Sequence, residues 1–386
     1  MKFFFKLTAL ALMLLGLPLL GVWMAGLPIE RYLQFPPEAI YVQHAAFSWP
    51  AFFAYLAFIL LVTVPLLTTG LRAWRQLGSQ RLRKPVGGLP WWGWLGAASG
   101  IVFWVLAWTR FNWFASLQAH TFTPLWLSYI LVINALKFRA CGRCMLTDRP
   151  GYLLLLFPTS ALFWWFFEYL NRFVQNWQYQ GTSFGPGEYM LYATISFSTV
   201  LPAVLGTRDL LLESRWIEAG FHSYHRLKFR HPRMLATGAL LAASAGLTGI
   251  GIWPDRLFPL LWVSPLLILV SQQAVLGEEH ILDPIGRGDW RMVTACAGAA
   301  LICGFFWEMW NCFSLAKWIY SIPFVQRFHL FEMPLLGYAG YLPFGLECAV
   351  IGDKIIDDCQ PHPPNTELKK GISEDKRLNS GSPHLL

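Results

Sequence analysis

Residues 151–173 read GYLLLLFPTSALFWWFFEYLNRF, an apolar run in which no charged residue precedes Glu168. A helix needs about 20 mostly apolar residues to cross a bilayer. This run is therefore long enough for a transmembrane helix. Its polar end, from Glu168 to Arg172, is expected close to one membrane surface.

The composition of the whole chain also indicates a membrane protein. Of its 386 residues, 55% are hydrophobic and 13% are charged, about half the roughly 25% of an ordinary soluble domain. The mean hydropathy is +0.43. These values exclude a disordered chain and argue against a soluble globular enzyme. We expect the net charge of +8 to mark loops on one side of a lipid bilayer, and we expect no nucleic-acid partner because no aromatic-basic recognition module occurs.

Nine further apolar segments lead to the prediction of an all-α polytopic membrane protein with about ten transmembrane helices. The predicted spans are residues 7–25, 49–71, 89–109, 122–137, 151–171, 188–206, 234–253, 257–276, 291–312 and 332–352. We expect the first to be a retained anchor, because a signal peptide has a shorter apolar region of roughly 7–15 residues. Residues 1–355 thus form the predicted membrane domain, and residues 356–386 a disordered cytoplasmic tail.

The distribution of basic residues tests this layout. With an even number of spans and both termini in the cytoplasm, 24 of the 30 Lys and Arg residues fall on the cytoplasmic side. The other six are Arg31, Arg110, Arg172, Arg256, Lys317 and Arg327. This asymmetry follows the positive-inside rule. It predicts a multi-pass protein of a plasma or inner membrane with both termini cytoplasmic.

Two segments carry the same motif, aromatic-Glu-x-x-Asn-x-Phe, and each continues to Trp-x-Tyr. The motif reads FEYLNRF at 167–173 and WEMWNCF at 307–313, with Trp-x-Tyr at 177–179 and 318–320. A weaker copy at 108–114 has Thr109 in place of Glu. We therefore predict repeated helical hairpins, with the strongest copies at 150–206 and 290–350. Internal repeats are common in transporter folds.

The polar residues of the motif are the main candidates for function. Within each copy Glu and Asn are three residues apart, so they share one helix face. A carboxyl group at membrane depth is costly and is often functional. Glu347 is a third such group, near the end of the last span. The candidate substrate or proton site comprises Glu168, Asn171, Trp307, Glu308, Asn311 and Glu347.

A structural role for these residues is the alternative. Crosswise hydrogen bonds from Glu168 to Asn311 and from Glu308 to Asn171 would pin the two copies together. Arg110 or Arg172 would instead neutralise one of the two Glu residues. Small residues on the face below Glu308 (Gly304, Ala300 and Ala297) favour the close approach of another helix, which would point Glu308 into the bundle.

No common cofactor motif is present, so the cofactor remains unknown. The sequence contains no phosphate loop, dinucleotide fingerprint, H-E-x-x-H or G-x-S-x-G. The lone C-x-x-C at 141–144 lacks two further zinc ligands. His222, His225 and His231 lie in a basic loop better suited to lipid headgroups, so we expect no metal site.

Three functions remain open at this stage. The first is binding or transport of a small amphipathic or lipid-like solute at the paired Glu/Asn sites. The second is an intramembrane enzyme that acts on an isoprenoid or another lipid, with a buried carboxyl as general acid. The third is a membrane assembly or scaffold protein whose polar pairs serve helix packing.

Overall fold

The computed structural model describes residues 2–37, 43–80 and 84–359, most of which are helical. The longer helices are α1 (Lys2–Ala11), α2 (Leu17–Met24), α4 (Trp49–Leu77), α5 (Trp91–Trp108), α6 (Phe122–Cys141), α8 (Pro150–Val174), α9 (Pro186–Phe197), α10 (Val200–Leu211), α12 (Pro232–Gly249), α14 (Leu260–Leu276), α15 (Arg291–Cys312) and α16 (Tyr341–Cys359). The short or irregular helices are η1 (Leu12–Gly16), α3 (Glu30–Leu33), η2 (Gly78–Gln80), η3 (Asn112–His120), α7 (Met145–Asp148), α11 (Arg215–Phe221), α13 (Pro254–Leu257), η4 (Asp283–Arg287) and η5 (Leu335–Gly340). The strands are β1 (Trp177–Gln180), β2 (Lys317–Tyr320), β3 (His329–Leu330) and β4 (Met333–Pro334).

Six helices in the described part of the chain are long and apolar enough to cross a membrane. They are Trp49–Gln80, Trp91–Trp108, Pro150–Val174, Pro186–Leu211, Arg291–Cys312 and Leu335–Lys354. A seventh results if η3 and α6, which are bent by 70°, form one broken span. The long apolar helices indicate a protein embedded in a membrane, where helices satisfy their own backbone hydrogen bonds.

The predicted count of about ten spans is not confirmed, although a helix lies at each of the ten predicted segments. The apolar helices Thr8–Met24 and Leu260–Leu276 have at most 17 residues. At 1.5 Å per residue this is roughly 25 Å, less than the ~30 Å hydrocarbon core. At the other end of the chain, α16 continues to Cys359, past the predicted start of the tail. The rest of the predicted tail lies outside the described residues.

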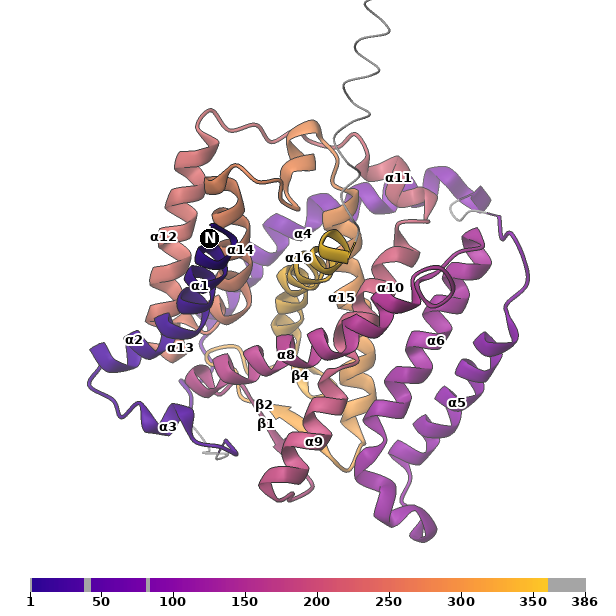
Figure 1. Cartoon of the computed structure of the whole chain (residues 1–386), viewed down its shortest axis with the longest axis horizontal. Coiled ribbons are helices and arrows are strands. Elements are labelled where there is room, and N and C mark those ends of the chain that lie inside the picture. Colours follow the sequence, from indigo (N-terminus) through magenta and orange to yellow (C-terminus); the bar gives the residue numbers. More distant parts are fainter. Residues whose placement is uncertain (1, 38–42, 81–83, 360–386) are drawn as a thin grey trace, which may run out of the picture.

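The helices form three groups (Figure 1). On one side α12 packs against α14 and α2, and on the opposite side α5 packs against α6. Between these groups lie α8, α10, α15 and α16, which pack against one another. Helix α4 contacts α11 and η5, its buried residues Phe52, Gly70 and Ala73 lie toward its two ends, and only 6% of its most apolar window is buried. Most of α4 therefore stands apart from the bundle.

Glycine residues bring α15 and α16 close together. A Cβ atom at Gly304 would lie 2.4 Å from the ring of Tyr341, and one at Gly345 would lie 2.1 Å from the carbonyl oxygen of Cys296. Small residues allow such close packing between helices in membranes. The predicted close approach at Gly304 is confirmed, and Glu308, one turn further along α15, is fully buried.

A two-stranded ribbon joins the two motif segments. β1 follows α8, β2 follows α15, and the two strands pair antiparallel. In this register Trp177 lies opposite Tyr320, and Tyr179 lies opposite Trp318. The Trp-x-Tyr elements of both segments therefore meet each other, at one end of the central helices (Figure 1).

Candidate functional site

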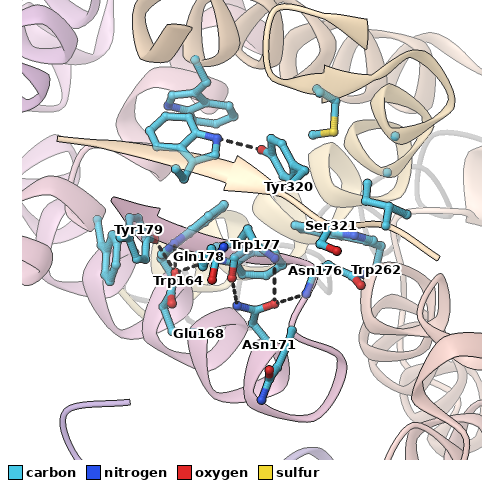
Figure 2. A pocket seen from close by; sticks show the side chains of 18 of the residues that line it. Trp164, Glu168, Asn171, Asn176, Trp177, Gln178, Tyr179, Trp262, Tyr320 and Ser321 are labelled. Atoms are coloured by element: carbon cyan, nitrogen blue, oxygen red, sulfur yellow. Dashed lines mark hydrogen bonds between the residues drawn. The ribbon is translucent and has the colours of Figure 1, made fainter. Parts of the chain in front are cut away.

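A cavity of about 1000 Å³ lies beside the β1–β2 ribbon (Figure 2). Aromatic side chains form much of its wall, among them Trp164, Trp177, Trp262, Trp307, Trp318 and Tyr320. The polar residues on the wall include Glu168, Asn171 and Arg172 of α8. The α4 side of the cavity is lined by Tyr55, Phe58, Ile59, Val62 and Thr63. A mostly apolar cavity with a few polar groups is typical of small-molecule sites.

Glu168 presents its carboxyl group to this cavity. Its Oε1 atom accepts hydrogen bonds from Trp164 Nε1 at 3.1 Å, Trp177 Nε1 at 3.0 Å and the Tyr179 hydroxyl at 2.6 Å (Figure 2). Its Oε2 atom accepts none from the described residues, and unlike the Oε2 of Glu308 it is not sealed from the cavity. One oxygen is thus held by the protein and the other is open to a ligand.

Glu308 has a different environment, because it is buried behind the cavity wall. Its Oε1 atom accepts hydrogen bonds from the hydroxyls of Tyr320 and Tyr341, each at 2.7 Å. Its Oε2 atom is buried with no partner among the described residues. The Tyr320 hydroxyl also accepts a hydrogen bond from Trp318 Nε1 at 2.9 Å. Burial, reinforced by the negative charge of Glu308, holds the pKa of Tyr320 well above its usual value, so its hydroxyl remains a donor.

The predicted crosswise hydrogen bonds between the copies are wrong. Each Asn instead binds the backbone of its own segment. Asn171 Nδ2 donates to the Trp177 carbonyl at 2.8 Å, and Asn171 Oδ1 accepts from the backbone N–H of Asn176 at 2.8 Å (Figure 2). Asn311 Nδ2 donates to the Trp318 carbonyl at 2.7 Å, and its Oδ1 accepts from the Trp318 N–H at 2.8 Å. An amide side chain can both donate and accept, and here it sets the turn from helix to strand.

Glu347 and Trp307, the other two candidates, lie on different sides of the cavity wall. Trp307 lines the cavity, and its ring stacks on Tyr341 with centroids 5.9 Å apart. Glu347 is fully buried and is not among the described residues that line the cavity. Its Oε1 atom accepts a hydrogen bond from the backbone N–H of Leu266 at 2.9 Å. Leu266 follows Pro265, and a proline inside a helix disturbs the hydrogen-bond ladder around it, so Glu347 satisfies a group at this break.

Neither arginine forms an ion pair with a motif carboxylate, although the charge of Arg172 lies near enough to Glu168 to act on it. Arg110 donates to the backbone carbonyls of Ala107, Thr109 and Phe313. Arg172 Nη1 donates to the carbonyls of Tyr32 at 2.9 Å and Gln34 at 2.7 Å. Both side chains fix loops beside the helix ends. Arg172 also lines the cavity.

Sequence reasoning missed several of the cavity residues. Trp164 is four residues before Glu168, and the contact of such pairs in a helix is a signal that could have found it. The Trp-x-Tyr elements supply hydrogen-bond donors to the carboxyl groups, a role that their sequence pattern alone does not indicate. No local sequence pattern indicates that Trp262, on α14, lines the cavity, because its position depends on the packing of helices that are distant in the chain.

No group of three or more His, Cys, Asp or Glu side chains in residues 2–37, 43–80 and 84–359 is placed to hold a metal ion. Cys141 and Cys144 of the C-x-x-C are free thiols. The fold and the site thus describe a helical membrane protein with an aromatic cavity and an open carboxyl group. Comparisons with protein families, curated proteins and solved structures found no match to this chain.

Proposed function

We propose that this multi-pass membrane protein binds a small amphipathic or lipid-like solute in the aromatic cavity. The observation that carries the proposal is the combination of a cavity of about 1000 Å³, walls rich in Trp and Tyr rings, and the open oxygen of Glu168. Apolar chains gain about 0.8 kcal/mol per buried CH₂ relative to water. The rings would hold the apolar part of the solute, and Glu168 would bind its polar end.

We also propose that the solute enters the cavity from the bilayer. Phe58 and Val62 of α4 line the cavity, and they are also 65% and 48% exposed. In a membrane-embedded helix such apolar exposure faces lipid. Since the buried residues of α4, which are Phe52, Gly70 and Ala73, lie toward its two ends, a solute would reach the cavity sideways past the middle of α4.

We also propose that residues 150–206 and 290–350 form repeated hairpins and that both termini lie in the cytoplasm. The antiparallel register of β1 and β2 supports a local two-fold relation, because it exchanges Trp177 with Trp318 and Tyr179 with Tyr320. The bonds from Tyr179 to Glu168 and from Tyr320 to Glu308 follow the same relation. In transporters of repeat architecture the solute lies at the repeat interface. The cavity lies beside the ribbon that joins the two motif segments, so transport of the solute is the mode of action we favour.

The two carboxyl groups have different roles in this proposal. Glu168 and Asn171 face the cavity and act on the solute or on its binding surface. Glu308, Asn311 and Glu347 are buried and stabilise the ribbon, α16 and α14. In this proposal the Glu of one motif copy binds the solute and the Glu of the other stabilises helix packing, while the Asn of each copy sets the turn from its helix into the ribbon.

The test is native mass spectrometry of the protein released from its own membranes, with two matched Ala→Trp variants. Ala193 lines the cavity, so Ala193→Trp would fill it. Ala57 is exposed on α4 and does not belong to the lining. We expect a bound lipid-like mass in the wild type and in Ala57→Trp that is lost in Ala193→Trp. The same bound mass in a folded Ala193→Trp variant would refute the proposal.

A further inference from the structure

We propose that the cavity selects a zwitterionic headgroup, with its ammonium group against Glu168 and its anionic group against Arg172. This inference rests on the function proposed above and names the class of solute. An amphiphile of this class carries a cation and an anion a few ångströms apart on one apolar tail, as in a phosphoethanolamine lipid.

Glu168 and Arg172 are four residues apart on α8, which places them one turn and about 6 Å apart along the axis. Both line the cavity. Neither forms an ion pair with the other or with another side chain in the described part of the chain. Two opposite charges held side by side without pairing match a ligand that carries both charges.

Each group keeps unused hydrogen-bonding capacity. Three donors bind Oε1 of Glu168 and leave Oε2 for an ammonium group. Among the described residues, Arg172 donates only through Nη1, to two loop carbonyls. Its guanidinium carries five N–H donors, so the Nη2 and Nε donors are left for a phosphate or carboxylate.

Tyr189 adds a third polar group at the same place. It lines the cavity, and its hydroxyl is buried without a hydrogen-bond partner among the described residues. It is close enough to interact electrostatically with both Glu168 and Arg172. The hydroxyl itself is sealed from the cavity, so Tyr189 adds polarity beside the two charged groups and leaves the direct contacts with the headgroup to Glu168 and Arg172.

Aromatic rings next to Glu168 favour a cation there. Trp164 and Trp177 both donate to Glu168, with ring centroids 6.4 Å apart, and Trp262 lies 5.7 Å from Trp177. Ammonium groups bind the faces of such rings. The cation side of the headgroup therefore has a carboxylate, and aromatic rings lie beside it on the cavity wall.

The experiment is competitive native mass spectrometry with four lipids that share dioleoyl tails. They are phosphatidylethanolamine (zwitterionic), phosphatidylglycerol (anionic), a trimethylammonium-propane lipid (cationic) and diacylglycerol (neutral). We expect the wild type to prefer phosphatidylethanolamine by at least about tenfold, which is 1.4 kcal/mol. Glu168→Gln should lose the preference over phosphatidylglycerol, and Arg172→Gln the preference over the cationic lipid. Arg172→Lys should restore part of it.

Matched controls at exposed sites outside the lining are Glu279→Gln and Arg230→Gln, which should leave the preference unchanged. Equal binding of phosphatidylethanolamine and diacylglycerol by the wild type would overturn the headgroup inference. So would a preference that survives both Glu168→Gln and Arg172→Gln. Ala193→Trp separates the two proposals. If it lowers the binding of all four lipids alike while the wild type has no preference, only the headgroup inference fails; if it lowers none, the cavity function fails as well.

Discussion

Trp177 lies directly opposite Tyr320 in the β1–β2 ribbon, and each residue serves a carboxyl group of its own segment. Trp177 donates its indole N–H to Glu168, and Tyr320 donates its hydroxyl to Glu308. The ribbon thus joins, through backbone pairing, residues that donate to the two carboxyl groups. It also forms part of the cavity wall, so a change in either segment is expected to affect the site.

Replacing Glu308 should destabilise the fold. Glu308→Ala leaves the hydroxyls of Tyr320 and Tyr341 without their acceptor and opens a space between α15 and α16. Side-chain hydrogen bonds in membrane proteins contribute about 0.6 kcal/mol on average and at most about 1.7 kcal/mol each. With the cost of the empty space added, we expect a loss of about 2 kcal/mol or more in the free energy of unfolding. Unfolding in mixed micelles followed by circular dichroism measures this change. Glu308→Gln, which keeps an acceptor oxygen, should lose less, and equal losses would argue against the role of the hydrogen bonds.

A methyl group at Gly345 should disrupt the contact between α15 and α16. Its Cβ would lie 2.1 Å from the carbonyl oxygen of Cys296, and a backbone atom cannot move aside as a flexible side chain can. Overpacking typically costs about 1–3 kcal/mol, so Gly345→Ala should lower the melting temperature. Gly238→Ala on α12 is the matched control, because a Cβ there meets nothing within 4 Å. A stable Gly345→Ala protein would contradict the helix packing described.

The buried hydroxyl of Tyr320 should make the free energy of unfolding fall in alkaline solution. Its pKa is raised well above the usual value by burial, with the charge of Glu308 adding to the effect. Below about pH 10 Tyr320 is protonated in both folded and unfolded states, and its contribution is fully present. Above pH 10 only the unfolded state loses the proton, so stability falls as pH rises, by up to about 1.4 kcal/mol per pH unit.

Thermal unfolding between pH 8 and pH 11 checks this dependence. Tyr320→Phe should remove one such contribution and give a shallower decline of the melting temperature above pH 10. The variant should also be less stable at neutral pH, because Trp318 Nε1 loses its acceptor. A slope identical to that of the wild type would show that Tyr320 is not held protonated by the fold.

The sequence predicted the helices better than it predicted the contacts of the site. A helix lies at each of the ten apolar segments that the sequence predicts, because a helix forms from local hydrogen bonds. The pairing of β1 with β2 escaped prediction, since four-residue strands far apart in the chain carry no local signal. The motif pointed to Glu168 and Glu308, yet their different exposure depends on Tyr341 and on the close packing at Gly304. The crosswise bonds failed because each Asn finds backbone partners in its own turn.

The most direct test of the cavity function is photocrosslinking with an amphiphile that carries a diazirine in its tail and a zwitterionic headgroup. The protein is labelled in its own membranes, and the sites are mapped by peptide mass spectrometry. We predict labels on the cavity side of α4, at Phe58 and Val62, and on the ribbon, and we predict that Ala193→Trp abolishes them. Labels confined to outward surfaces such as Leu162 and Leu241, which are 74% and 66% exposed, and unchanged in Ala193→Trp, would contradict the account.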